Sequence, residues 1–262
     1  MKGDCVHLPF LMFVSTSCTV RRREGLERNM KRYEAILFDI DDTLLDFKQS
    51  EHVALEQLLA SYNVRMTDEV KSRYVDINSG LWRAFERGEV DREEVLIGRH
   101  TKLFDSLGLT VDGPYVEQQY RDYLHAGVHM VDGALEVVRK LSNDYPLYIV
   151  TNGVTETQFK RLESSGLLPY FQDVFVSDAT GSQKPMKPFF DYVFDRIPNV
   201  APEKGLIIGD SVTADIAGGR MYGLDTCWFN PNEVAATIES TYEIRHLNEL
   251  KSLLYVQAGL SE

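Results

Sequence analysis

The sequence predicts an α/β protein with a doubly wound, mainly parallel sheet and a helical cap domain inserted after the first strand. Two observations support this fold class. From Tyr33 onward, short apolar runs alternate with helical patterns, and several runs are almost continuously apolar, as parallel strands covered on both faces should be. Between the first two runs lie residues 40–146, which are far too many for a single crossover helix.

Five segments have the composition of strands, with β-branched or aromatic residues bounded by turn-forming ones. They are Ala35–Asp39, Leu147–Thr151, Asp173–Ser177, Leu206–Gly209 and Thr226–Phe229. Between them, Thr155 and Gln158 have the spacing of a capping box, and Gly166 is placed to end that helix. The i, i+3, i+4, i+7 spacing of a buried helical face is found at Phe190, Val193, Phe194 and Ile197.

The long stretch after the first strand has helical patterns throughout and no good strand. Thr67, with acids directly after it, and Asp91, with Glu94 three residues later, have the composition of helix starts. We therefore predict a helical cap that is inserted into an α/β core. The cap comprises residues 48–127, and the core comprises residues 30–47 and 128–262.

Residues 1–29 are expected to lie outside this organisation. Leu8–Val14 is apolar but too short to span a bilayer. The basic residues 21–23 follow this run, whereas a signal peptide has its basic region first. We expect a leader that is disordered or not part of the natural protein, with Met30 as the natural start; a membrane anchor is the less favoured alternative. The expected location is the cytoplasm.

Composition and charge restrict the class of partner. Of the 262 residues, 44% are hydrophobic and 26% are charged, which suits an ordinary globular protein. The cysteines are Cys5, Cys18 and Cys227; their odd number and wide spacing fit a reducing compartment, and Cys227 is expected to be a buried apolar residue. The net charge of −12 argues against nucleic-acid polymers and anionic membranes as partners. A small phosphorylated substrate stays possible, because local cations and a metal can reverse the field inside one pocket.

The strongest chemical signal is the acidic segment 39–44, Asp-Ile-Asp-Asp-Thr-Leu, which directly follows the apolar run 35–38. Side chains at i and i+2 of an extended chain share one side, so Asp39 and Asp41 are expected to face a common space. This space lies at the carboxyl end of the first strand, where open α/β sheets bind ligands. Crowded acids repel one another, and a bound cation usually keeps them ionised. The structural alternative is an acidic turn that only solvates the chain.

Three further polar clusters follow along the chain. The segment 151–153, Thr-Asn-Gly, ends the second strand, where hydroxyl and backbone N–H groups can hold phosphate oxygens. Lys184 comes from a loop that Pro185 stiffens. Asp210 ends a later strand, and Asp215 lies five residues beyond it. Each cluster is a weak signal alone, but four of them in one chain, three at strand ends, form a specific pattern.

In this order, the four clusters resemble the four signature blocks of the haloacid dehalogenase (HAD) superfamily. The resemblance implies a Rossmann-like core and hydrolysis of a phosphomonoester through an aspartyl-phosphate intermediate. Asp39 matches the nucleophile, and Asp41 matches the general acid/base, whose presence favours phosphoester chemistry because a halide leaving group needs no proton. Thr151 and Asn152 would hold the transferring phosphoryl group, and Lys184 would offset its charge.

The same resemblance implies Mg²⁺ as the cofactor. The metal ligands would be the carboxylates of Asp39 and Asp210 and the backbone carbonyl of Asp41. Asp215 would support the metal's surroundings or Lys184.

A closer likeness extends into the predicted cap. Residues 80–88, 151–166 and 225–230 look like parts of the bacterial pyrimidine 5′-nucleotidase subgroup, whose members dephosphorylate UMP, dUMP, dTMP and non-standard pyrimidine nucleotides. The resemblance implies a nucleoside 5′-monophosphate as substrate. Trp82 and Phe85 are then candidates to stack on the base, and simple packing within the cap is their structural alternative.

Two other functions stay open from the sequence. One is a sugar-phosphate or phosphoglycolate phosphatase on the same scaffold, which only the cap can distinguish from a nucleotidase. The other is a non-enzymatic phospho-acceptor similar to a response-regulator receiver, which Asp41 and the long cap disfavour. A metal pair at His125 and His129 is also disfavoured, because no carboxylate is placed to complete it. The oligomeric state is not predicted.

Overall fold

The computed structural model describes residues 33–258, so the predicted leader (residues 1–29) lies outside the described residues. Six strands form one parallel sheet in the order β3-β2-β1-β4-β5-β6. They are β1 (Ala35–Phe38), β2 (Leu147–Thr151), β3 (Asp173–Val176), β4 (Gly205–Gly209), β5 (Asp225–Phe229) and β6 (Tyr242–Ile244). The five predicted strands are confirmed to within one residue at each end. β6 is missing from the sequence prediction because three residues are too short for a clear pattern.

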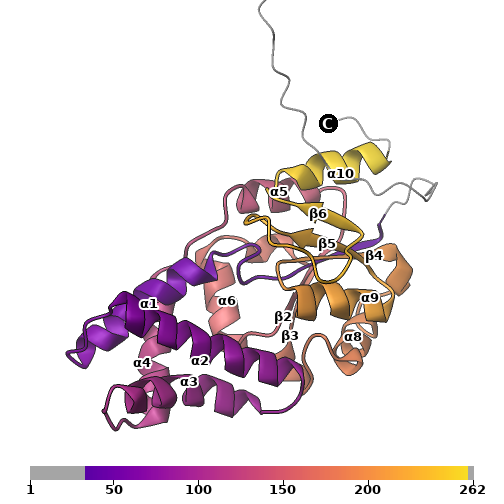
Figure 1. Cartoon of the computed structure of the whole chain (residues 1–262). Helices are drawn as coiled ribbons and strands as arrows, with labels where there is room; N and C mark the ends of the chain where they lie inside the picture. Colours follow the sequence, from indigo (N-terminus) through magenta and orange to yellow (C-terminus); the bar gives the residue numbers. More distant parts are fainter. Residues whose placement is uncertain (1–32, 259–262) are drawn as a thin grey trace, which may run out of the picture.

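Helices cover both faces of this sheet (Figure 1). On one face, α5 (Ala134–Leu141), α6 (Thr155–Ser164) and α10 (Glu249–Ala258) share a core with alternate strand residues such as Ile36 and Phe38. On the other face, α8 (Lys187–Phe194) and α9 (Gly218–Tyr222) pack against the remaining strand residues, including Ala35 and Leu37. All four residues of β1 are fully buried. This two-sided burial explains why the strands are apolar without alternation and confirms the doubly wound fold.

Two predictions about the core are also confirmed. Phe190 and Val193 are buried on the face of the sheet that α8 covers, with Phe194 partly buried beside them. Ile197 is buried in the same cluster but lies beyond the end of α8 at Phe194, so the helix is shorter than its predicted apolar face. Cys227 is fully buried among apolar side chains, and burial raises the pKa of its thiol. This cysteine is therefore a packing residue.

The helix-start signals give a mixed result. The side chains of Thr67 and Asp91 each accept a backbone hydrogen bond at the start of their helices, as predicted. The predicted capping box at Thr155 and Gln158 is wrong: Val154 is the N-cap of α6, and its side chain makes no capping hydrogen bond. Instead, Gln158 reaches into the sheet edge, as described below. Gly166 follows the end of α6 with φ of 71°, which agrees with its predicted role.

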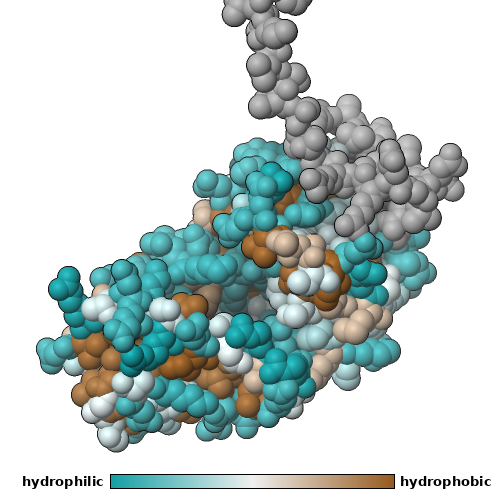
Figure 2. Space-filling model, in the orientation of Figure 1, coloured by the Kyte–Doolittle hydropathy of each residue, from teal (hydrophilic) through white to brown (hydrophobic). Residues whose placement is uncertain are grey.

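The insertion after β1 is a bundle of four helices, which confirms a helical cap; its exact limits stay a prediction. The helices are α1 (Phe47–Ser61), α2 (Asp68–Glu86), α3 (Arg92–Ser106) and α4 (Gly113–Ala126). They bury their own apolar core, to which Leu58, Tyr74 and Phe104 belong. Apolar residues also gather on the outer surface of these helices (Figure 2).

A narrow neck joins the cap to the core. The two connecting segments run antiparallel, with a bridge between Leu45 and Met130. The backbone N–H of Asp46 donates to the carbonyl of His129 at 2.9 Å, and that of Val131 donates to the carbonyl of Leu44 at 3.0 Å. The chain therefore enters and leaves the cap through two segments that lie side by side.

A buried ionic group stabilises the inside of the cap. Glu117, on α4, is only 3% exposed and accepts hydrogen bonds from Arg99 at 2.9 Å and Arg121 at 2.7 Å. The ring of His100 lies 2.9 Å from the same carboxylate. Burial disfavours the charge on Glu117, but these neighbours outweigh it and lower its pKa to about 2.

Among the described residues, no helix is both long and apolar enough to cross a membrane.

Candidate active site

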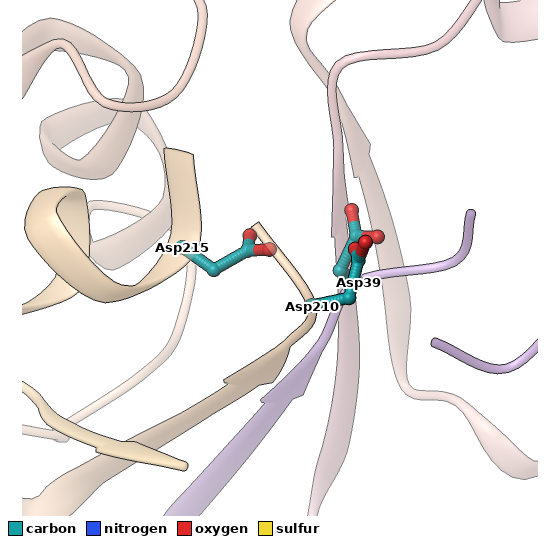
Figure 3. Close-up of side chains that lie close together, drawn as sticks. All are labelled: Asp39, Asp210 and Asp215. Atoms are coloured by element: carbon teal, nitrogen blue, oxygen red, sulfur yellow. The ribbon is translucent and has the colours of Figure 1, made fainter. Parts of the chain in front are cut away.

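The predicted acids meet at the carboxyl edge of the sheet. β2, β1 and β4 are neighbours, so Thr151 at the end of β2, Asp39 after β1 and Asp210 after β4 lie side by side. Asp215 comes from the π-helical turn η3 (Val212–Ala217), which follows β4. Carboxylate oxygens of the three aspartates lie within 4.8 Å of one another. Figure 3 shows the carboxylate of Asp215 directed toward those of Asp39 and Asp210. The three clusters that the sequence places at strand ends therefore lie at one edge of the sheet.

Lys184 is buried in the middle of these acids, with 1% of its surface exposed. Its Nζ donates to Asp39 Oδ1 at 2.7 Å, to Asp215 Oδ1 at 2.6 Å and to the Val150 carbonyl at 2.7 Å. Burial disfavours the charged amine, but the two carboxylates outweigh this effect and raise the pKa of Lys184. The lysine therefore stays protonated and supplies a fixed positive charge between two aspartates.

Asn152 holds the loop that carries this lysine. Its side chain accepts from the Lys184 backbone N–H at 2.9 Å and donates to the Lys184 carbonyl at 2.9 Å. The sequence predicts Asn152 as a phosphate ligand, but its side-chain amide is occupied with this loop. Only the backbone N–H of Asn152 is then suited to that predicted role.

Asp41 is fixed by two residues of α6. Gln158 Nε2 donates to Asp41 Oδ2 at 2.7 Å and to Thr151 Oγ1 at 2.8 Å. Arg161 forms an ion pair with the other carboxylate oxygen of Asp41. The guanidinium of Arg161 is almost fully buried and lies 5.2 Å from the centre of the Phe47 ring. The sequence prediction assigned Gln158 to a capping box and gave Arg161 no role, because polar residues of an amphipathic helix are normally taken as solvent-facing.

The acids provide a donor set that suits a hard divalent cation. Desolvation raises the pKa of Asp39 despite Lys184, and desolvation with the charges of Asp215 and Asp42 raises that of Asp210 to about 7. A cation among these oxygens would stabilise the ionised forms of Asp39 and Asp210 and so lower both pKa values. Both oxygens of Asp215 already accept hydrogen bonds, from Lys184 at 2.6 Å and from the Ser211 backbone N–H at 3.1 Å. Asp39 and Asp210 are therefore the better-placed ligands, and Asp215 supports Lys184.

A cavity of about 630 Å³ lies between this edge and the cap. Its floor includes the acids, Thr151 and Lys184, and its roof is formed by the cap helices. Of the two predicted aromatic contacts, the structure brings Trp82 to the cavity wall, whereas Phe85 is absent from its lining. Phe85 is 5% exposed, packs with Leu81 and Val95, and meets the Trp82 ring edge-on at 5.7 Å. It therefore acts as a packing residue that supports Trp82.

The roof also contains polar residues that the sequence prediction missed. Glu51, on α1, accepts hydrogen bonds from Tyr74 at 3.1 Å and from Asn78 at 2.8 Å, and all three residues line the cavity. Burial is the main cause of a raised pKa at Glu51. Glu86, at the end of α2, lines the cavity as well. The helical periodicity shows which positions face inward but not which inward polar residues meet in space.

A doubly wound sheet with a cluster of aspartates and a buried lysine at its carboxyl edge, covered by a helical cap, is the arrangement expected of a HAD-type hydrolase. Comparison with known families agrees with this class. The model of the haloacid dehalogenase-like hydrolase family matches residues 33–223. The chain belongs to this family.

Individual relatives cover nearly the whole chain. YfnB of Bacillus subtilis, named as a HAD-hydrolase, is 50% identical over 234 residues, which are 88% of this chain and all of YfnB. Its magnesium-bound crystal structure, which is described as revealing interdomain movement, matches with a TM-score of 0.83 over 86% of this chain and 99% of that chain. The pyrimidine 5′-nucleotidase PynA of Streptococcus pneumoniae is 39% identical and covers 85% of this chain and 95% of PynA. The pyrimidine 5′-nucleotidase YjjG of Escherichia coli is 29% identical over 85% of this chain and 98% of YjjG.

Proposed function

We propose that this HAD phosphatase is a Mg²⁺-dependent pyrimidine nucleoside 5′-monophosphatase that acts through an aspartyl-phosphate on Asp39. The observation that carries the chemistry is the arrangement of Asp39 and Asp41. Lys184 occupies one oxygen of Asp39, Gln158 and Arg161 orient the carboxylate of Asp41, and both aspartates line the same cavity.

In the first half-reaction, Asp39 attacks phosphorus through its second oxygen, Oδ2. The bond between phosphorus and the ester oxygen breaks, and Asp41 gives its proton to the departing oxygen. Thr151 and the backbone N–H of Asn152 are suited to hold the phosphoryl oxygens at the end of β2. The positive charge of Lys184 offsets the charge on the nucleophile and on the phosphoryl group.

In the second half-reaction, water attacks phosphorus, the bond between phosphorus and Asp39 Oδ2 breaks, and Asp41 accepts the proton of the water, so that Asp39 and inorganic phosphate are released. Dividing the reaction in this way is covalent catalysis, which replaces one difficult step by two easier ones. Mg²⁺ bound by the carboxylates of Asp39 and Asp210 and the Asp41 carbonyl would supply further positive charge at the phosphoryl oxygens. The magnesium-bound structure of YfnB supports this choice of cofactor.

The proposed substrate follows from the relatives and from the roof of the cavity. Two relatives that span nearly the whole chain are named pyrimidine 5′-nucleotidases. A volume of about 630 Å³ is within the usual range for small-molecule sites. Trp82 offers an aromatic face on the cavity wall, and an aromatic face can stack on a base. We also propose that the cap moves relative to the core to admit the nucleotide, as the interdomain movement of YfnB suggests.

The decisive experiment measures phosphate release from a panel of substrates with Mg²⁺. The panel contains UMP, dTMP, CMP, AMP, GMP, phosphoglycolate, several sugar phosphates and p-nitrophenyl phosphate. The highest kcat/KM is expected for a pyrimidine nucleotide, and Asp39→Asn should give no turnover. A preference for sugar phosphates over all nucleotides would favour the alternative phosphatase. Phosphorylation of the protein without turnover would indicate the phospho-acceptor.

A further inference from the structure

One corner of the cap is hydrogen-bonded to the core at three separate loops. This α2–α3 corner, residues 85–92, ends α2 and begins α3, and Figure 1 shows these helix ends beside the core. Gln183 Nε2 donates to the Phe85 carbonyl at 2.6 Å, and Thr213 Oγ1 donates to Glu86 Oε2 at 2.6 Å. Arg92 makes the third connection.

Each of these loops carries a residue of the candidate active site. Gln183 directly precedes Lys184, and Thr213 lies between Asp210 and Asp215. Arg92 binds the loop that follows Thr151. The cap therefore contacts the loops behind the phosphate site as well as covering the cavity.

Of the three connections, the one made by Arg92 has the most hydrogen bonds. Its Nη1 donates to the carbonyls of Asn152 at 2.7 Å and Gly153 at 2.9 Å, and its Nη2 donates to Ser177 Oγ at 2.6 Å. Its Nε lies 3.4 Å from a carboxylate oxygen of Asp178. The planar guanidinium carries five N–H donors on three separate nitrogens, so it reaches four acceptors on two segments of the core, which the three donors on the single nitrogen of a lysine could not all match.

The position of Arg92 in its own helix gives an independent argument. Arg92 is the first residue of α3, directly after the N-cap Asp91. A cation at this end of a helix is unfavourable, because the helix dipole is positive there. The two acids that follow, Glu93 and Glu94, are what helix stability favours. Within the cap, the Arg92 guanidinium lies 4.9 Å from the centre of the Phe85 ring, but its hydrogen bonds and its ion pair all go to the core, and these explain its position best.

We propose that Arg92 is a positioning residue that fastens the closed cap to the loop after Thr151. Docking of the α2–α3 corner encloses the cavity and fixes the backbone of Asn152 and Gly153 at the same time. When the corner moves away from the core, the cavity opens and the loop loses its two hydrogen bonds from Arg92, at the carbonyls of Asn152 and Gly153. The start of α7 (Ser177–Thr180) loses the contacts of Ser177 and Asp178 with the same side chain. This inference rests on the proposed function, because the loop that Arg92 holds is the proposed phosphate-binding loop.

The kinetic test compares Arg92→Ala with Arg87→Ala. Arg87 belongs to the same corner but is exposed and pairs only with exposed Glu89 among the described residues, so it is a matched control. With the best phosphomonoester from the panel, Arg92→Ala should lower kcat/KM on the order of 10- to 100-fold, as expected for a small misplacement of the reacting groups. Guanidinium ion at low concentration should restore part of the activity of Arg92→Ala and have no such effect on wild type. Arg87→Ala should behave as wild type.

A second measurement tests, without using activity, whether Arg92 fastens the cap to the core. Spin labels are placed on exposed Asp76 of α2 and on Met221 of α9, which is 71% exposed, in a chain whose Cys5 and Cys18 are replaced by serine. Pulsed electron paramagnetic resonance should give a narrow distance distribution in the parent protein and a broader one, extended to longer distances, with Arg92→Ala. The distances stay measurable even if the wild-type protein hydrolyses none of the phosphomonoesters, an outcome that would defeat the proposed function alone.

Two results would overturn the proposed role of Arg92. One is an unchanged distance distribution in Arg92→Ala. The other is a loss of activity that guanidinium does not restore and that accompanies a large fall in Tm, because this would show a purely structural residue.

Discussion

Replacing Asp210 by asparagine should abolish activity and yet stabilise the metal-free protein. Asp210 lies after β4 among other acids, and its pKa is raised to about 7 by burial and by the charges of Asp215 and Asp42. The folded protein without metal must therefore hold a carboxylate where a neutral group would be preferred. Asparagine has nearly the same shape and carries no charge.

The size and the pH dependence of this effect follow from linkage. A pKa of about 7 in the folded chain, against the ordinary 3.8, corresponds to a penalty on the order of 4 kcal/mol for the ionised form. Between these two pH values the folded chain binds more protons at Asp210 than the unfolded chain does. The stability of metal-free wild type should therefore fall as pH rises through this window, by up to about 1.4 kcal/mol per pH unit. Asparagine does not titrate, so the advantage of Asp210→Asn should be small at about pH 4 and complete above about pH 7.

Urea unfolding of both proteins with a chelator present, at intervals from about pH 5 to pH 8, measures this difference directly. Comparing the two proteins cancels the titration of all other groups that the substitution leaves unchanged. Added Mg²⁺ should then stabilise wild type, increasingly with pH, and should have little effect on the variant. The reasoning is refuted if the metal-free variant is the less stable protein at about pH 8, or if the difference between the two does not change with pH.

Three further predictions concern single side chains. Asp41→Asn should keep the binding of substrate and lower kcat by at least about 10²- to 10⁴-fold, because proton transfer is lost; steady-state kinetics would contradict the assigned role if kcat were unchanged. Trp82→Ala should lower kcat/KM for UMP by an amount that corresponds to a loss of ~1 to 3 kcal/mol of transition-state stabilisation. Turnover of p-nitrophenyl phosphate should hardly change, and equal losses on both substrates would argue for a packing role. Glu117→Gln should destabilise the protein by about 3 to 5 kcal/mol near neutral pH, because Arg99 is left buried without its partner. Because the pKa of Glu117 falls from 4.5 to about 2 on folding, this loss should shrink as pH falls between these values, and a constant loss in urea unfolding would oppose this account.

The parallel core could be predicted from the sequence because its strands are buried on both faces. Ile36 and Phe38 face one layer of helices while Ala35 and Leu37 face the other, so burial alone determines the apolar run. The convergence of the acids follows from the same fact, since parallel strands bring their carboxyl ends to one edge. Short-range patterns and topology therefore sufficed for the core of the candidate site.

The residues that hold the acids could not be predicted in this way. Gln158 has the spacing of a helix-capping residue, yet its amide contacts Asp41 and Thr151. Arg161 lies on the same helix and is almost fully buried. The contacts of Gln158 and Arg161 with Asp41 join positions that are 117 and 120 residues apart in the sequence. No local sequence pattern predicts such long-range contacts, which are seen only in the folded structure.

The neck between Leu44–Asp46 and His129–Val131 has a consequence for how this protein can change over generations. A segment that leaves and re-enters a fold at almost the same point can be lengthened, shortened or exchanged without moving the ends of the strands that flank it. Trp82, Glu51 and the other roof residues all belong to that segment, whereas the reacting aspartates do not. A gene encoding this chain could therefore acquire a new roof by recombination at two short sites and keep the same reaction beneath it.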